Sequence, residues 1–177
     1  LFGSSGFPVE TYPYYEPATR GVNFPAMKAK LANLPAGSIV VLHACCHNPT
    51  GADLDESQWR EIIEVVREQR LLPFIDMAYQ GFADGISEDA LALDLFVASG
   101  LQFFVSSSFS KSFSLYGERV GALSVITSSR DEAGRVLSQL KRIIRTNYSN
   151  PPTHGAAIVG AVLTNPELRA EWEAELG

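Results

Sequence analysis

Short apolar runs alternate with longer amphipathic segments along most of this 177-residue sequence, and this alternation limits the folds open to it. Runs typical of buried β-strands lie at 39–43, 72–76, 102–106 and 120–126. Segments with apolar residues at the three- and four-residue spacing of a helix lie at 56–69, 88–98 and 130–146. Strands that alternate with helices are typical of α/β domains, so we expect a three-layer αβα sandwich with a mostly parallel sheet.

Helix start signals support these boundaries. The candidate caps are Asn23 with Pro25 for a further helix over 27–34, and Asp53, Asp55 or Ser57 for the helix over 56–69. After the pair Pro151 and Pro152 a helical pattern resumes, and it still continues at the last residue. Since the sequence also begins with Leu1, we expect it to be a piece of a longer chain.

The composition narrows the class of protein. Hydrophobic residues make up 46% and charged residues 19%, which suits one globular domain with a sizeable core. Fourteen Lys and Arg against twenty Asp and Glu give a net charge of −6 with scattered basic residues, so we expect no nucleic-acid partner. No apolar run approaches the ~20 residues of a membrane helix, and two adjacent cysteines offer no disulfide framework. We therefore predict a cytoplasmic protein that does not bind a membrane.

Polar residues follow three of the predicted strands. Asn48 lies just beyond the first strand, Asp76 ends the second, and Lys111 lies just beyond the third. In open α/β sheets, ligands bind outside the carboxyl ends of the strands. Three separate segments are therefore expected to bring an amide, a carboxylate and an amine to one edge of the sheet.

These groups match the needs of pyridoxal 5′-phosphate, whose aldehyde forms a Schiff base with a lysine and whose ring nitrogen is kept protonated by an acid. Lys111 is the candidate Schiff-base lysine, and Asp76 is the candidate partner of the ring nitrogen. Tyr79, three residues after Asp76, is a candidate donor to the phenolic oxygen, a place that Asn48 could share. The candidate phosphate ligands are Ser108 and Arg119.

Each of these residues, taken alone, has an ordinary structural explanation. Lys111 fits a solvated loop, and Asp76 could cap a turn. Residues 48–51 have the composition of a plain turn, and Tyr79 could belong to the core. The functional interpretation is favoured because all four fall at the same predicted edge of the sheet.

Four stretches of the sequence resemble a known family in their order and spacing. They are HACCHNPTGAD, FIDMAYQGFADG, SSSFSKSFSLYGERVG and IIRTNYSNPPTHG. The family is that of the fold type I pyridoxal-phosphate aminotransferases, in the class of the aspartate and aromatic amino acid enzymes, and the resemblance runs from about Gly6 to the end. The stretches FSLYGERVGALSV and EAGRVLSQLK are most similar to the bacterial aromatic amino acid enzymes.

The resemblance implies a role for each candidate residue. Lys111 would bind the cofactor covalently, Asp76 would contact the ring nitrogen, Asn48 and Tyr79 the phenolic oxygen, and Ser108 and Arg119 the phosphate. Arg145 would bind the distal carboxylate of dicarboxylic substrates from across the interface of a homodimer with shared active sites. Ser149 and Asn150 would line the same entrance. Arg145 also has a structural explanation, because an arginine in the last turn of a helix suits the helix dipole.

The segment from His43 to His47 raises the alternative of a zinc site. Alternation along a strand would put His43, Cys45 and His47 on one face, but the sequence offers no evident fourth ligand. We therefore expect no metal, and we interpret Cys45 and Cys46 as packing residues. The resemblance instead implies that His43 lies beside Asp76 under the cofactor ring.

The motifs together predict an enzyme that transfers the amino group of tyrosine and phenylalanine to 2-oxoglutarate and also accepts dicarboxylic amino acids. The alternatives are an aspartate aminotransferase or, in another class, a catalytically silent fragment or binding homologue. By the resemblance, residues 1–177 are part of the cofactor-binding large domain, without the family's N-terminal and C-terminal parts. The missing parts include the phosphate-binding loop, the aromatic residue that stacks on the ring and the arginine that binds the substrate α-carboxylate. We therefore expect the isolated fragment to be inactive.

Overall fold

The computed structural model describes residues 2–176. The strands are β1 (Tyr15–Glu16), β2 (Gly21–Val22), β3 (Ile39–His43), β4 (Leu72–Met77), β5 (Phe103–Ser108) and β6 (Gly121–Ile126). The α-helices are α1 (Phe24–Leu31), α2 (Glu56–Gln69), α3 (Leu91–Ser99), α4 (Arg130–Asn147), α5 (His154–Thr164) and α6 (Pro166–Leu176). Short 3-10 helices cover Gly3–Ser5 and Glu88–Ala90. No helix among these residues is both long enough and apolar enough to span a membrane.

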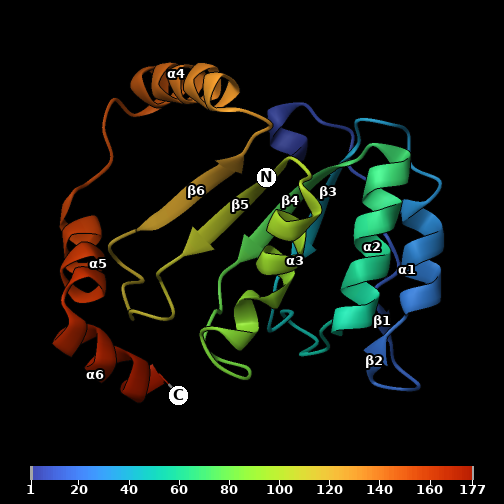
Figure 1. Ribbon diagram of the computed structural model, residues 1–177, viewed down its shortest axis with the longest axis horizontal. Coiled ribbons are helices and arrows are strands. Elements are labelled where there is room, and N and C mark those ends of the chain that lie inside the picture. Colours follow the sequence, from blue (N-terminus) through green and yellow to red (C-terminus); the bar gives the residue numbers. More distant parts are fainter. Residues whose placement is uncertain (1, 177) are drawn as a thin grey trace.

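The main sheet has the strand order β3-β4-β5-β6 (Figure 1). Strands β3, β4 and β5 are parallel, and β6 pairs antiparallel with β5. Helix α2 connects β3 to β4 and α3 connects β4 to β5, as expected for parallel strands that need long crossovers. The predicted α/β class with a mostly parallel sheet is confirmed.

One face of this sheet carries the hydrophobic core. Along β4 the buried residues alternate with half-exposed ones, so every second side chain points into the core. Helices α2 and α3 cover this face (Figure 1), where the ring of Phe96 packs against those of Trp59 and Phe103 at centroid distances of 6.2 and 5.4 Å. These three aromatic residues are at most 2% exposed, so they form part of the core.

The opposite face of the sheet is only partly covered by residues 2–176. Phe74 and Phe104 lie on this second face, where both are only partly buried and their rings stack at a centroid distance of 5.9 Å. The N-terminal segment supplies part of the cover: the ring of Phe2 contacts Phe74, and Tyr12 donates a hydrogen bond of 2.8 Å to the carbonyl of Val41. Because successive side chains of a strand point to opposite faces, the alternation that buries one set in the core leaves the other set partly exposed.

The helix caps follow the sequence closely. The side chain of Asn23 accepts a hydrogen bond from the Ala26 amide and caps α1. The helix therefore starts at Phe24, earlier than the predicted helix over 27–34. Asp55 caps α2 and forms a reciprocal capping box with Gln58. The other predicted strands and helices are present, with ends that differ by only a few residues.

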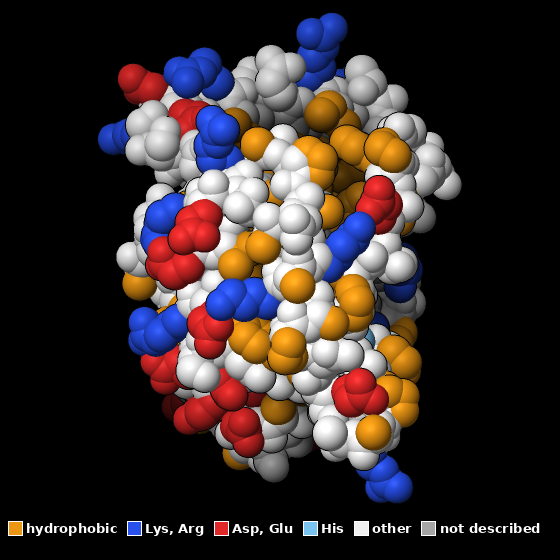
Figure 2. Space-filling model, turned by 90° about the vertical axis from the view of Figure 1, so that its right-hand side faces the viewer, with side chains coloured by type: hydrophobic (Ala, Val, Ile, Leu, Met, Phe, Trp, Pro, Cys, Tyr) orange, Lys and Arg blue, Asp and Glu red, His pale blue; other side chains and the backbone are white. Residues whose placement is uncertain are grey.

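Charged side chains are interspersed on the surface over α1 and α2. Figure 2 shows basic and acidic groups side by side there, separated by apolar patches. Lys28 of α1 pairs with Glu61 of α2 at 2.7 Å, and Arg60 pairs with Glu56 along α2 at 2.6 Å. Surface pairs of this kind contribute little stability individually, but the first of them joins two helices that also pack together.

Candidate active site

A row of polar side chains crosses the sheet near the carboxyl ends of its parallel strands. Strand register pairs His43 with Asp76 and Asp76 with Ser106, so the three residues share one face. The hydroxyl of Ser106 donates a hydrogen bond of 3.2 Å to Oδ1 of Asp76. Within residues 2–176 nothing donates a hydrogen bond to the second oxygen, Oδ2, which leaves it available to an external donor.

The segments that follow the three parallel strands meet around Tyr79. Nδ2 of Asn48, from the loop after β3, donates a hydrogen bond of 3.0 Å to the Tyr79 hydroxyl. The amine of Lys111, from the loop after β5, lies 4.9 Å from the centroid of the Tyr79 ring, which is within cation–π distance. An amide, a phenol and an amine from separate segments are therefore in direct contact.

Local hydrogen bonds shape the backbone on both sides of Lys111. The Ser110 amide donates to the Ser108 hydroxyl at 3.2 Å, and the Ser114 amide donates to the carbonyl of Lys111 at 2.9 Å. Ser110 itself is buried. Across residues 2–176 no carboxylate forms an ion pair with Lys111, so its amine is not neutralised by a fixed partner.

The two candidate phosphate ligands lie at the ends of the connection between β5 and β6. Ser108 is the last residue of β5 and is in register with Gly121, where a Cβ would lie 2.7 Å from a backbone oxygen of Ser107. Arg119 has a left-handed φ of 52°, and its Nη1 donates a hydrogen bond of 3.0 Å to the Tyr116 carbonyl. That single bond fixes the guanidinium while leaving most of its donors free for an anion.

Arg145, Ser149 and Asn150 are not brought to this group of residues within one chain. They lie at the exposed end of α4, where Arg145 Nη1 donates a hydrogen bond to the Ser149 hydroxyl. Because β6 runs antiparallel to β5, α4 follows at the end of the sheet opposite to the loop that holds Lys111 (Figure 1).

Asp53 has a role that the sequence reasoning missed. It was a candidate cap of α2, but its carboxylate instead accepts hydrogen bonds from the amides of Cys46 and His47 at 2.6 and 2.8 Å. The His47 ring stacks on Tyr14 at 3.9 Å, and burial together with the nearby His43 lowers the pKa of His47. Asp53 thus fixes the loop that carries Asn48, and no sequence signal distinguished this role from capping.

Asp89 is the second carboxylate that sequence reasoning missed. It is 5% exposed and accepts hydrogen bonds from the amides of Gly81, Ala83 and Asp84 at 2.7, 3.2 and 3.1 Å. These bonds hold the loop that follows Tyr79. A single aspartate near the start of a predicted helix gives no hint that it bonds to a loop before it.

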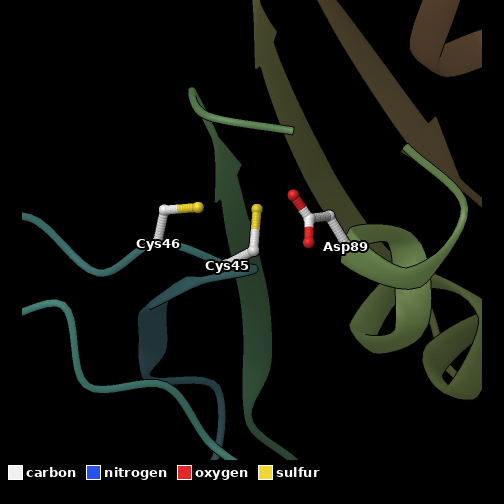
Figure 3. A group of neighbouring side chains, drawn as sticks. All are labelled: Cys45, Cys46 and Asp89. Atoms are coloured by element: carbon white, nitrogen blue, oxygen red, sulfur yellow. The ribbon is translucent and has the colours of Figure 1, made fainter. Parts of the chain in front are cut away.

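Where the zinc alternative assumed His43, Cys45 and His47 as ligands, the structure brings Cys45 and Cys46 close to Asp89. Strand β3 ends at His43, so His47 does not continue the alternation, and the Cys45 side chain lies next to the carboxylate of Asp89 (Figure 3). The ligand atoms of Cys45, Cys46 and Asp89 lie within 4.8 Å of one another. Burial raises the pKa of both thiols, which favours the neutral form, and three backbone amides already satisfy Asp89. These contacts agree with packing roles for the cysteines.

Comparison with known proteins agrees with the motifs. The family profile described as aminotransferase class I and II matches residues 1–176. The chain is 64% identical over its whole length to an aspartate aminotransferase of Pseudomonas aeruginosa and 54% identical over 176 residues to an aromatic-amino-acid aminotransferase of Escherichia coli.

A solved structure gives the same result for the fold. The structure is that of an aromatic-amino-acid aminotransferase from Burkholderia pseudomallei covalently bound to pyridoxal phosphate. It aligns with a TM-score of 0.98 and 66% identity over 99% of this chain. The chain spans 44% of the length of each of these three proteins. The prediction of family is confirmed: the chain belongs to the aminotransferases of class I and II.

Proposed function

We propose that this chain is the cofactor-binding part of a pyridoxal 5′-phosphate-dependent aminotransferase, with residues 1–177 forming an incomplete large domain. The observation that carries the proposal is the contact of Asn48 and Lys111 with Tyr79, just after the strand β4 that carries Asp76. Membership of the aminotransferase family supports the same conclusion.

The chemistry of these side chains fits the cofactor. Asp76 has one oxygen bonded by Ser106 and the other open to a protonated ring nitrogen. Asn48 and Tyr79 offer an amide and a hydroxyl to the phenolic oxygen, and Lys111 offers an amine without a carboxylate partner among residues 2–176. Ser108 and Arg119 would hold the phosphate, since a guanidinium presents a planar fork of donors.

Each residue contributes a separate part of the chemistry. When bound, the cofactor supplies the electron sink that lets the α-proton of an amino acid leave. The Lys111 amine would take that proton from Cα as a general base and, as a general acid, deliver it to C4′ of the cofactor. The Asp76 carboxylate keeps a proton on the ring nitrogen, and Tyr79 orients the Lys111 amine that lies over its ring. His43, in register with Asp76, packs beside it.

For the substrates, we propose tyrosine and phenylalanine as amino donors and 2-oxoglutarate as acceptor, with dicarboxylic amino acids also accepted. The E. coli relative and the B. pseudomallei structure, both named for aromatic amino acids, support this choice. The 64% identity to a protein named aspartate aminotransferase favours the second candidate, an aspartate-specific enzyme.

Arg145, Ser149 and Asn150 belong to this proposal only through a homodimer. Because Arg145 is exposed at the far end of the sheet, we propose that it binds the distal carboxylate of a substrate in the active site of a second subunit. A cytoplasmic location likewise stays a prediction, based on the cysteine content.

The test is amino-group transfer by the full-length protein supplied with pyridoxal 5′-phosphate. We expect Lys111→Ala to lower kcat/KM for tyrosine by about a thousandfold or more, because it removes the proton carrier. Lys141→Ala, on the exposed surface of α4, is the matched control and should stay within about twofold of the wild type. Full activity of Lys111→Ala would refute the proposal, and a kcat/KM for aspartate far above that for tyrosine would select the second candidate.

A further inference from the structure

Helix α6 is attached to the segment that contains Lys111 through one side chain. Nε1 of Trp172 donates a hydrogen bond of 2.6 Å to the carbonyl of Ser112, the residue next to Lys111. The indole also stacks on Phe113, with ring centroids 4.5 Å apart and an interplanar angle of 19°. Two different contacts therefore join Trp172 to neighbouring residues of a segment far away in the sequence, the hydrogen bond spanning 60 positions.

The same helix reaches the loop that follows Tyr79. Gly81 has a φ of +95°, and a Cβ at this position would lie 2.4 Å from Cδ2 of Leu176. Gly81 therefore permits a close approach that a larger residue would obstruct. Helix α6, which lies beside the turn between β5 and β6 (Figure 1), is thus in contact with two of the three loops that meet at Tyr79.

Trp172 is well placed to hold the Lys111 backbone from its C-terminal side. On the N-terminal side the Ser110 amide donates a hydrogen bond to the hydroxyl of Ser108, the last residue of β5. The chain leaves the sheet after Ser108 and returns to it only at Gly121, where β6 begins, so Lys111 lies in the connection between the two strands. The indole N–H fixes the Ser112 carbonyl, and the stacking fixes the Phe113 ring. Together these contacts restrict residues 111–113, which belong to no strand.

We propose that Trp172 is a positioning residue that holds the 111–113 segment and thereby the Lys111 amine. The connection to catalysis rests on the proposed function, whereas the effect on the segment does not. A small displacement of a reacting group can cost up to two orders of magnitude in rate, so loosening this segment is expected to lower kcat more than it raises KM.

The experiment uses the full-length protein with three variants. Trp172→Ala removes the hydrogen bond and the stacking, whereas Trp172→Phe keeps an aromatic ring but loses the N–H donor. Glu171→Gln, exposed on the same helix, is the control. Hydrogen exchange is measured on the cofactor-free protein, and kcat and KM are measured on the cofactor-loaded protein.

We expect faster exchange of the amides of residues 112–115 in Trp172→Ala, with exchange in β4 unchanged. The expected fall in kcat is about tenfold for Trp172→Ala and smaller for Trp172→Phe, with KM within about twofold. Unchanged exchange in 112–115, or equally faster exchange throughout the protein, would overturn the inference. Absence of transaminase activity in the wild-type protein would refute the proposed function. The exchange data would still decide whether Trp172 holds the 111–113 segment.

Discussion

Helices α2 and α4 have the same kind of amphipathic sequence but very different surroundings. In α2, Trp59, Ile62, Ile63, Val65 and Val66 are buried against the sheet and its neighbours. In α4 none of the 18 residues is buried, and Leu137 and Ile143 on its apolar side are 51% and 59% exposed. The contrast extends to the regions around them, because the fully buried residues of the main core cluster run from Met27 to Val105, and among residues 121–176 only the partly buried Ile126 packs against them.

The difference shows what an amphipathic pattern specifies. It predicts that a helix has an apolar side, but not which part of the protein covers that side. Since the chain spans 44% of the length of its relatives, we expect the apolar side of α4 to be covered in the longer protein. The proposed active site divides in the same way: Asp76 belongs to the packed region, whereas Arg145 belongs to the open one.

The largest expected effect is the loss of a core side chain in the packed region. Phe96→Ala should lower the free energy of unfolding by about 3–5 kcal/mol, because it leaves a cavity between Trp59 and Phe103. Val97→Ala on the same helix, where the side chain is 60% exposed, should change it by less than about 0.5 kcal/mol. Urea denaturation measures both, and similar losses for the two variants would contradict this account of the core.

A second expected effect concerns the buried carboxylate of Asp89. Asp89→Ala should cost about 2–3 kcal/mol, because three backbone amides lose a charged acceptor. Asp84→Ala, an exposed change in the same loop, is the control and should be nearly neutral. Urea midpoints give the comparison, and a neutral Asp89→Ala would mean that water replaces the carboxylate without loss.

A charge placed on the apolar side of α4 tests whether that side, unlike the apolar side of α2, is exposed. In the 177-residue chain, Ile143→Asp should change the free energy of unfolding by less than about 0.5 kcal/mol, since Ile143 is already exposed. In the full-length protein the same change should cost about 1–3 kcal/mol if that side is covered. Equal small effects in both proteins would show that α4 stays open.

The smallest expected effect is a pH dependence from His47. Because burial lowers its pKa, the folded protein binds fewer protons at this site than the unfolded chain does. Its stabilising contribution is therefore complete above the usual value of 6.5 and is lost as the pH falls through the lowered pKa. His47→Phe, which keeps a ring against Tyr14, should show a shallower loss of stability below pH 6.5 in urea titrations at several pH values. An identical pH profile would exclude this contribution.

The sequence predicted the sheet and the site where local signals were sufficient. Asn23 and Asp55 identified helix starts, and the positions of Asn48, Asp76 and Lys111 after strands predicted a common edge. Tertiary contacts were not predictable in this way. Trp172 bonds to a residue 60 positions earlier, and Asp89 bonds backward to the amides of the loop that precedes its helix, so neither contact belongs to a recognised local motif.

Borohydride reduction of the full-length protein loaded with pyridoxal 5′-phosphate tests whether Lys111 binds the cofactor covalently. A reduced and labelled lysine resists trypsin, so we expect a cofactor mass on one peptide covering residues 71–119, and no such mass in the Lys111→Ala variant. Cleavage after Lys111 with no label on the chain, or a label on Lys141 instead, would contradict it.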